Sequence, residues 1–320
     1  MQVVITGACG FLGRVLCEAA LQAWPGDEHR FLLIDRQFKQ EVRDRRAVQI
    51  EHNLSELPAL QGVLSDAEII FHLAVIPGGA AERDFELSRK VNLRASLALM
   101  DFWAQRRGKR FVYASSIAVF GEPLPREIND QTVPRPTMTY GSHKLMVETE
   151  LANMTRLSLL DAWALRLPGL VARPEITPGL KSAFLSELFH ACAQRRAFSV
   201  PMSPEACVWL MSAQCAAENL IHAAKITGAP AEIPRALTLP ALRVTIRELV
   251  AAICLESGGR VEDVTYQPEE AIEAQFGRLP PLTTGFADQL GFRHDGHLDR
   301  LVKRAFNAAG YGVASAGGAP

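Results

Sequence analysis

This sequence of 320 residues has no long hydrophobic run and almost no net charge. No stretch reaches the roughly 18–20 uninterrupted apolar residues that a membrane helix needs, so we expect no membrane span. The formal net charge of −1 provides no overall field that would attract nucleic acid or an anionic membrane. The sequence therefore favours neither a membrane protein nor a nucleic-acid-binding protein.

Cysteine pairs and metal-binding spacings are also absent. The six cysteines form no C-x-x-C motif and stand among apolar residues, and the eight histidines show no spacing typical of a metal site. Met1 is followed directly by a β-rich run, without a basic, cleavable leader. We therefore expect reduced, buried thiols, no metal and a cytoplasmic location.

Short β-rich runs alternate with longer helical patterns in the first half of the chain. Strands are expected at the short apolar runs, which are residues 2–6, 30–35, 48–51, 68–73, 110–114 and 162–167. Helices are expected between them, at about residues 11–23, 81–107 and 140–157. Continuous apolar strands that alternate with helices predict an α/β fold with a doubly wound parallel sheet, covered by helices on both faces.

A G-x-x-G-x-x-G loop stands between the first expected strand and the first expected helix, at Gly7, Gly10 and Gly13. Gly7 would allow the tight turn, Gly10 would let the backbone approach a pyrophosphate, and Gly13 would let the helix pack close to the strand. The helix N-terminus then offers free N–H groups and the positive end of its dipole to phosphates. This loop predicts a dinucleotide site on a Rossmann fold.

Asp35 ends the second expected strand, about twenty residues beyond the glycine loop. A carboxylate at this position can accept hydrogen bonds from the ribose hydroxyls and would repel a 2′-phosphate, which favours NAD over NADP. Arg36 stands beside it, and an arginine can accommodate that phosphate. We predict NAD, and NADP stays open.

The later part of the chain has a looser pattern that prolines interrupt. We expect helices at about 181–195, 214–226, 246–255 and 298–308, and short strands at 198–200, 208–211 and 235–239. Residues 1–168 are expected to form the Rossmann domain, which residues 207–227 would rejoin. Residues 169–206 and 228–310 would form a smaller C-terminal α/β substrate lobe, followed by a disordered tail at 311–320.

A Y-x-x-x-K motif, Tyr140 to Lys144, opens the expected helix at 140–157, where positions i and i+4 share one face. A phenol has a pKa of about 10, and a nearby ammonium favours the phenolate that can act as a base. Upstream, the strand at 110–114 runs into Ser115 and Ser116, and ligands bind at such strand ends. A Ser116 hydroxyl can hold a substrate oxygen while Tyr140 takes its proton. Ser116, Tyr140 and Lys144 are therefore the predicted catalytic residues of an enzyme.

These motifs, together with Phe71-His-Leu-Ala74, Lys90-Val-Asn92 and Leu165-Arg-Leu-Pro168, resemble the extended short-chain dehydrogenase/reductase family. The resemblance implies that Lys144 binds the nicotinamide ribose and lowers the pKa of Tyr140. It also implies further residues along the cofactor, which are Phe11, Leu12, Asn53, Leu54, Leu73, Ala74, Val75, Asn92, Ala114, Leu167 and Pro168.

The same resemblance implies a homodimer. The helical patterns at 81–107 and 140–157 would pair with their copies across a two-fold axis and form a four-helix bundle. The alternative is that both helices are buried within one chain.

Many extended members act on nucleotide sugars, but two features disagree with such a substrate. Ile117 and Ala118 stand where dehydratases of the family carry an acid pair, and the segment 206–210 offers no cation for a diphosphate. A closer resemblance, through Ala118–Pro125, Ala164–Pro168 and Ala236–Pro240, is to the D-erythronate dehydrogenase group. It implies that NAD oxidises the C2 hydroxyl of a four-carbon sugar acid to the 2-oxo acid.

An acid substrate needs a cation for its carboxylate. That group tends to carry an arginine where Cys207 stands, so Arg173 and Lys181 are the candidates here, and either could instead be a surface charge. Pro77 and Gly78 are expected to border the substrate pocket beside Ser116 and Tyr140. A nucleotide-sugar epimerase with retained NAD and a non-catalytic sensor of the NAD pool are the competing hypotheses.

Overall fold

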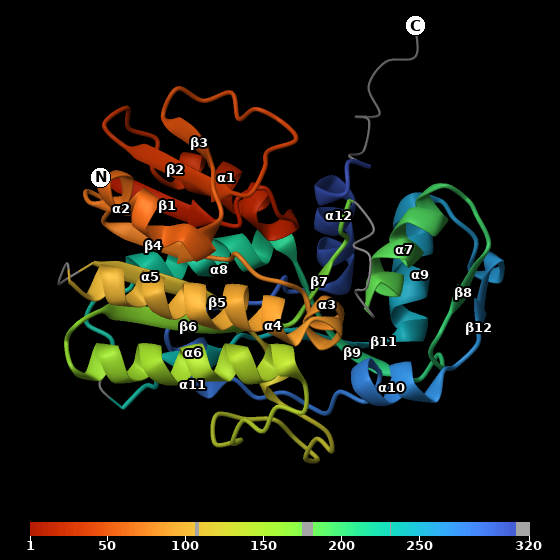
Figure 1. Ribbon diagram of the computed structural model, residues 1–320. Helices are drawn as coiled ribbons and strands as arrows, with labels where there is room; N and C mark the ends of the chain where they lie inside the picture. The colour runs from red at the N-terminus through yellow and green to blue at the C-terminus, as the bar shows by residue number, and fades with distance from the viewer. Residues whose placement is uncertain (106–108, 175–181, 231, 312–320) are drawn as a thin grey trace, which may run out of the picture.

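The computed structural model describes residues 1–105, 109–174, 182–230 and 232–311. Seven strands form one parallel sheet in the order β10-β6-β5-β4-β1-β2-β3 (Figure 1). Their bounds are β1 Gln2–Thr6, β2 Arg30–Asp35, β3 Ala47–Glu51, β4 Ile69–His72, β5 Arg110–Ser116, β6 Asp161–Leu167 and β10 Ala236–Thr238. The predicted doubly wound α/β fold is confirmed. Within the described residues, no helix is both long and apolar enough to cross a bilayer.

Helices cover both faces of the sheet because successive residues of each strand point to opposite sides. Val3 and Ile5 of β1 pack with α1 (Phe11–Ala23) and α8 (Ala213–Lys225). Val4, between them, packs on the other face with α5 (Ala95–Ala104) and α6 (Thr139–Arg156). All three side chains are fully buried. This pattern explains why the buried strands are apolar without alternation.

The helix expected over residues 81–107 is broken, so that prediction is wrong. The chain instead forms α3 (Gly78–Arg83), α4 (Phe85–Ser88), a π-helical turn (Arg89–Arg94) and then α5. Asp84 causes the first break, because its non-helical backbone ends α3 and its side chain accepts a hydrogen bond from the N–H of Leu87. Such a cap satisfies an N–H group that would otherwise lack a partner at the start of α4.

The C-terminal part forms a smaller α/β lobe with its own apolar cluster. Its sheets are β11-β9-β7 and β12-β8, with bounds β7 Gly169–Val171, β8 Phe198–Val200, β9 Cys207–Ser212, β11 Leu242–Thr245 and β12 Val264–Tyr266. Its helices are α7 Ala183–Ala193, α9 Ile246–Ser257, α10 Glu270–Phe276 and α12 Leu298–Ala308. Short helices elsewhere are α2 Gln61–Leu64 and α11 Gly285–Gln289, with 3-10 turns at Leu54–Leu60, Ile117–Val119 and Val261–Asp263. The exact domain boundaries stay a prediction.

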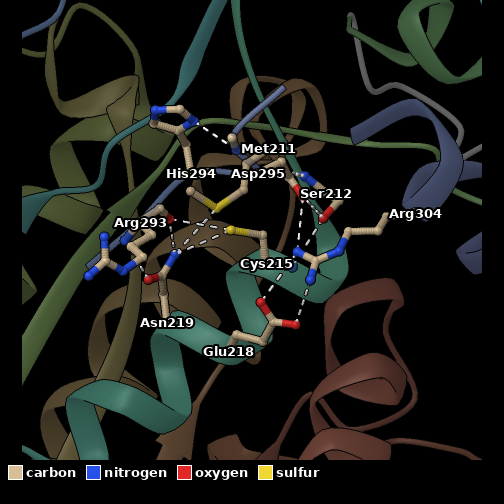
Figure 2. Close-up of polar contacts among 10 residues, drawn as sticks. Met211, Ser212, Cys215, Glu218, Asn219, Arg293, His294, Asp295 and Arg304 are labelled. Carbon is tan, nitrogen blue, oxygen red and sulfur yellow. Dashed lines mark hydrogen bonds and ion pairs between the residues drawn. The ribbon is translucent and has the colours of Figure 1, made fainter. Parts of the chain in front are cut away.

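A buried polar cluster fastens α12 to α8 and β9 (Figure 2). Both the N–H and the hydroxyl of Ser212 donate to Asp295, at 2.9 and 2.6 Å. Arg304 of α12 pairs with Asp295 at 3.2 Å and with Glu218 of α8 at 3.0 Å. Removing one partner of a buried ion pair costs about 3–5 kcal/mol. The cluster therefore holds the last helix to the body of the protein.

Two expectations about burial and order need correction. Four cysteines are buried as expected, whereas Cys9 and Cys207 are partly exposed. Cys9 is exposed because it lies in the glycine loop and lines the cavity described below. The tail predicted at 311–320 lies outside the described residues except for Tyr311, whose hydroxyl is hydrogen-bonded to His190. Order therefore extends at least to Tyr311.

Candidate active site

One cavity of about 710 Å³ opens at the carboxyl ends of the central strands. It is lined by Gly7 after β1, Asp35 at the end of β2, Leu73 after β4, Ser116 at the end of β5 and Pro168 after β6. The sheet order reverses here, since β2 lies on one side of β1 and β4 on the other. Ligands of doubly wound folds bind at such a switch point.

The cavity brings together nearly all residues singled out from the sequence. Besides the five just named, its lining includes Gly10, Phe11, Leu12, Gly13, Arg36, Asn53, Leu54, Ala74, Val75, Pro77, Gly78, Ala114, Tyr140, Lys144, Leu167 and Arg173. Asn92 is absent from that lining, and Lys181 lies outside the described residues.

The glycine loop leaves room for a phosphate group against the backbone. Gly7 has a φ of +71°, and a Cβ there would lie 2.7 Å from the backbone nitrogen of Ala74. Gly10 precedes the first turn of α1, and no side chain caps that end of the helix. The N–H groups of the first turn are therefore directed toward the cavity, as dinucleotide phosphates require. The residues present fit a dinucleotide.

Asp35 and Asn53 line the same cavity as the glycine loop. Asp35 accepts hydrogen bonds from the N–H of Cys9 at 2.8 Å and from the N–H of Arg36 at 2.7 Å. Asn53 accepts one from the N–H of Ser55 at 3.1 Å and so begins a 3-10 turn. The carboxylate of Asp35 is thereby fixed next to the glycine loop.

The phenol of Tyr140 lies near the hydroxyl of Ser116 at the other end of the cavity, close enough for a hydrogen bond that lowers the pKa of Tyr140. The N–H of Ala118 donates to Ser116 Oγ at 3.1 Å, which orients the hydroxyl. Burial raises the pKa of Tyr140 to about 12, while the charge of Arg173 and the bond to Ser116 lower it. From the sequence, the lowering of this pKa was expected of Lys144. In the structure the cation that lowers this pKa is Arg173, and the effect expected of Lys144 stays a prediction.

Lys144 lies one turn after Tyr140 on α6 with its ammonium buried. Its Nζ donates to the carbonyl oxygen of Ala114 at 2.5 Å and lies 4.4 Å from the ring centre of Tyr113 and 5.6 Å from that of Tyr140. Burial lowers the pKa of Lys144 to about 7, and the charge of Glu148 acts in the opposite direction. An amine is thus held beside the ring of the candidate base.

Glu148 was not singled out from the sequence. This buried carboxylate pairs with Arg166 of β6 at 2.7 Å and accepts a hydrogen bond from the hydroxyl of Ser115 on β5. It fixes α6 to the two strands whose ends line the cavity. Its position four residues after Lys144, on the same helix face, was the signal that could have revealed it.

Arg173 is a cation in the lining of the same cavity. Its guanidinium lies 5.5 Å from the ring centre of Phe11, and burial lowers its pKa. Among the described residues, no carboxylate or hydrogen-bond acceptor contacts this guanidinium. Sequence reasoning missed the neighbouring lining residues Trp209, Gln275 and Leu279, because they belong to β9, α10 and a loop with no recognisable motif.

Asn92 is placed behind the cavity wall. Its side chain accepts from the N–H of Ile76 at 2.7 Å and donates to the carbonyl oxygen of Ile76 at 3.0 Å. The prediction that Asn92 lines the cofactor site is therefore wrong, since it acts on the backbone of a lining residue. Gly78, expected in a loop, is the first residue of α3, and a Cβ there would lie 3.8 Å from Tyr140.

Comparison with known proteins agrees with this geometry. The model of the NAD dependent epimerase/dehydratase family matches residues 3–206. The chain belongs to this family. It is therefore an enzyme of an NAD-dependent oxidoreductase and isomerase family, and the predicted family membership is confirmed.

Two D-erythronate dehydrogenases are similar over nearly the full length. The one from Cupriavidus necator is 32% identical, with 97% of this chain and 99% of that protein covered. The one from Haemophilus influenzae is 28% identical, with 95% and 98% covered. A solved structure of a nucleoside-diphosphate-sugar epimerase from Agrobacterium tumefaciens has a TM-score of 0.86 at 27% identity, with 96% of this chain and 94% of that chain covered.

Proposed function

We propose that this enzyme is an NAD-dependent dehydrogenase that oxidises the C2 hydroxyl of a small sugar acid similar to D-erythronate, giving the 2-oxo acid. The observation that carries the proposal is that one cavity holds both the Tyr140–Ser116 pair and the guanidinium of Arg173, which has no acidic partner among the residues that the structure describes. The pair suits a hydroxyl and the guanidinium suits a carboxylate. The similarity to two D-erythronate dehydrogenases supports the same substrate class.

In this proposal, each group of cavity residues has a role in binding the cofactor or in moving the proton. The glycine loop and the start of α1 hold the pyrophosphate, and Asp35 holds the adenosine ribose, which favours NAD over NADP. NAD, when bound, supplies the hydride acceptor. Ser116 donates a hydrogen bond to the C2 oxygen while Tyr140 takes the proton of that hydroxyl. Lys144 binds the nicotinamide ribose and, together with Arg173, favours the phenolate.

The size of the cavity supports a small substrate. About 710 Å³ lies within the range of about 300–1,000 Å³ that single-ligand pockets occupy. A cofactor and a nucleotide sugar would have to share this space, whereas a four-carbon acid needs little of it. The alternative of a nucleotide-sugar epimerase rests on the family and on the similar solved structure.

An NADH-absorbance screen over sugar acids and the matching polyols tests the proposal. We expect NADH to form with D-erythronate or a close analogue and to form much more slowly with the polyols, which lack the carboxylate. Tightly retained NAD, no net NADH and inversion of a UDP-sugar would instead establish the epimerase. NAD binding without a response to any substrate would establish the sensor.

We also propose a homodimer formed through the helices beside the site. Phe85 of α4 and Met146 of α6 are both 51% exposed and border a groove of about 570 Å³. Exposed large apolar side chains that border one groove suit an interaction surface. A cytoplasmic location, proposed from the free cysteines, would be tested by cell fractionation.

A further inference from the structure

The backbone of Arg173 is held on both sides by α7. Its N–H donates to the hydroxyl of Ser186 at 3.1 Å, and its carbonyl oxygen lies 2.6 Å from His190 Nε2. Ser186 and His190 are four residues apart and therefore lie on one face of the helix. One helix face thus fixes both ends of a single residue.

The second ring nitrogen of His190 is also bonded. A carbonyl oxygen can only accept, so Nε2 carries the hydrogen and Nδ1 is an acceptor. Nδ1 lies 3.0 Å from the hydroxyl of Tyr311, which therefore donates to it. That hydroxyl in turn accepts from Gln194 Nε2 at 3.1 Å. The imidazole is fixed in orientation by groups from α7 and from the segment after α12.

The guanidinium of Arg173 has no comparable support of its own. Among the described residues, its guanidinium lies over the ring of Phe11 and forms no ion pair. An arginine side chain has many rotamers, so its placement depends strongly on where its backbone is fixed. Neither His190 nor Tyr311 lines the cavity, so an effect of either residue on a ligand is indirect, and the contacts of His190 with the Arg173 backbone offer the route.

We propose that His190, with Ser186, is a positioning residue that places Arg173 to bind the carboxylate of the substrate, and so determines the selectivity for acids over neutral polyols. The inference rests on the proposed function for the identity of the acid. Precise placement matters because a charge-assisted, two-pronged bond to a carboxylate has strict geometry.

The test measures binding without turnover. Calorimetry gives the dissociation constant of D-erythronate for the enzyme saturated with NADH, which cannot accept a further hydride. In His190→Phe, which keeps a ring but loses both hydrogen bonds, we expect this constant to rise about tenfold, as loss of one good hydrogen bond implies. In His190→Gln, whose amide can still donate to the Arg173 carbonyl, we expect most of the affinity to return.

His222→Phe is the matched control. His222 also donates from Nε2 to a backbone carbonyl, that of Leu290 at 2.7 Å, but on α8 and away from the cavity lining. It should lower the melting temperature about as much as His190→Phe while leaving the affinity for D-erythronate unchanged. NADH affinity should be unchanged in all three variants.

Combining His190→Phe with Arg173→Gln shows whether His190 affects the affinity for D-erythronate through Arg173. We expect His190→Phe to add less than about a twofold change in the Arg173→Gln background, because coupled residues are not additive. An equal loss in both backgrounds, an unchanged affinity in His190→Phe, or no binding of D-erythronate by the unaltered enzyme would overturn the inference. Binding that depends on His190 but yields no NADH on turnover would overturn the proposed function alone.

Discussion

The glycine loop at one end of the cavity is a single short stretch of chain, whereas the other end, around Arg173, collects side chains from several distant segments. Gly7, Gly10 and Gly13 follow one another at three-residue spacing, while Arg173, Trp209 and Gln275 come from separate segments of the chain. Phosphates are bound by backbone N–H groups, which demand glycine at fixed spacing. A carboxylate is bound by one well-placed side chain, which demands no local pattern.

The largest expected effect is the loss of turnover when Tyr140 is replaced. Tyr140→Phe removes the proton acceptor but keeps the ring, so we expect kcat to fall by about 10²–10⁴-fold. NAD affinity, measured by fluorescence titration, should stay within about twofold because the glycine loop is untouched. Full turnover in this variant would show that another group takes the proton.

At the substrate end, Arg173→Gln should raise KM for the acid by about 10–100-fold, since one charge-assisted hydrogen bond is worth about 1.5–3 kcal/mol. NAD affinity should not change, which separates the two ends of the cavity. Arg173→Lys keeps the charge without the two-pronged geometry, so its KM for the acid should lie between those of the unaltered enzyme and Arg173→Gln. Steady-state kinetics with both reactants varied would check this. Equal losses for the acid and the matching polyol would contradict a carboxylate contact.

The same substitution should also move the pH profile. Oxidation needs the phenolate of Tyr140, so kcat/KM should rise with pH up to the pKa of that group. Because Arg173 lowers the pKa of Tyr140, its loss should shift the rising limb to higher pH. A shift to lower pH, or none, would show that the charge of Arg173 does not act on the phenol.

At the cofactor end, Gly10→Ala should weaken NAD binding about tenfold, equivalent to about 1.4 kcal/mol. The added Cβ would lie 3.1 Å from the carbonyl oxygen of Gly7, a tight contact that requires a small shift of the loop, and it would occupy the approach of the pyrophosphate. Gly62→Ala is the control, because a Cβ there meets nothing within 4 Å. Fluorescence titration of both variants is the measurement, and equal NAD affinity would contradict the placement of the phosphates.

The smallest effect on turnover is expected for a residue outside the cavity. Met146→Glu places a charge on the exposed groove between α4 and α6, and we expect it to halve the mass found by light scattering. Turnover should change by less than about threefold, since Met146 contacts neither reactant. An unaltered protein that is a monomer at micromolar concentration would disprove the dimer.

The same contrast explains what could be predicted from the sequence. The bounds of β1, α1 and β2 agree with the prediction, because uninterrupted apolar runs and a glycine loop mark them. The break at Asp84 was missed because its cause is one side-chain bond to the N–H of Leu87, which leaves the hydrophobic periodicity intact.

The substrate end was predicted only in part. Arg173 was found because an acid substrate needs a cation, whereas Gln275 lies on α10, a short helix without capping signals. The role of Asn92 was misplaced because sequence position cannot distinguish a lining residue from one that holds the lining backbone. Such contacts depend on long-range packing, which local patterns do not encode.

The most direct measurement uses D-erythronate that carries deuterium at C2. The account predicts that the enzyme transfers this deuterium to the nicotinamide ring of NADH, with one 2-oxo acid formed for each NADH. Deuterium retained in the product, or unlabelled NADH, would contradict oxidation at C2.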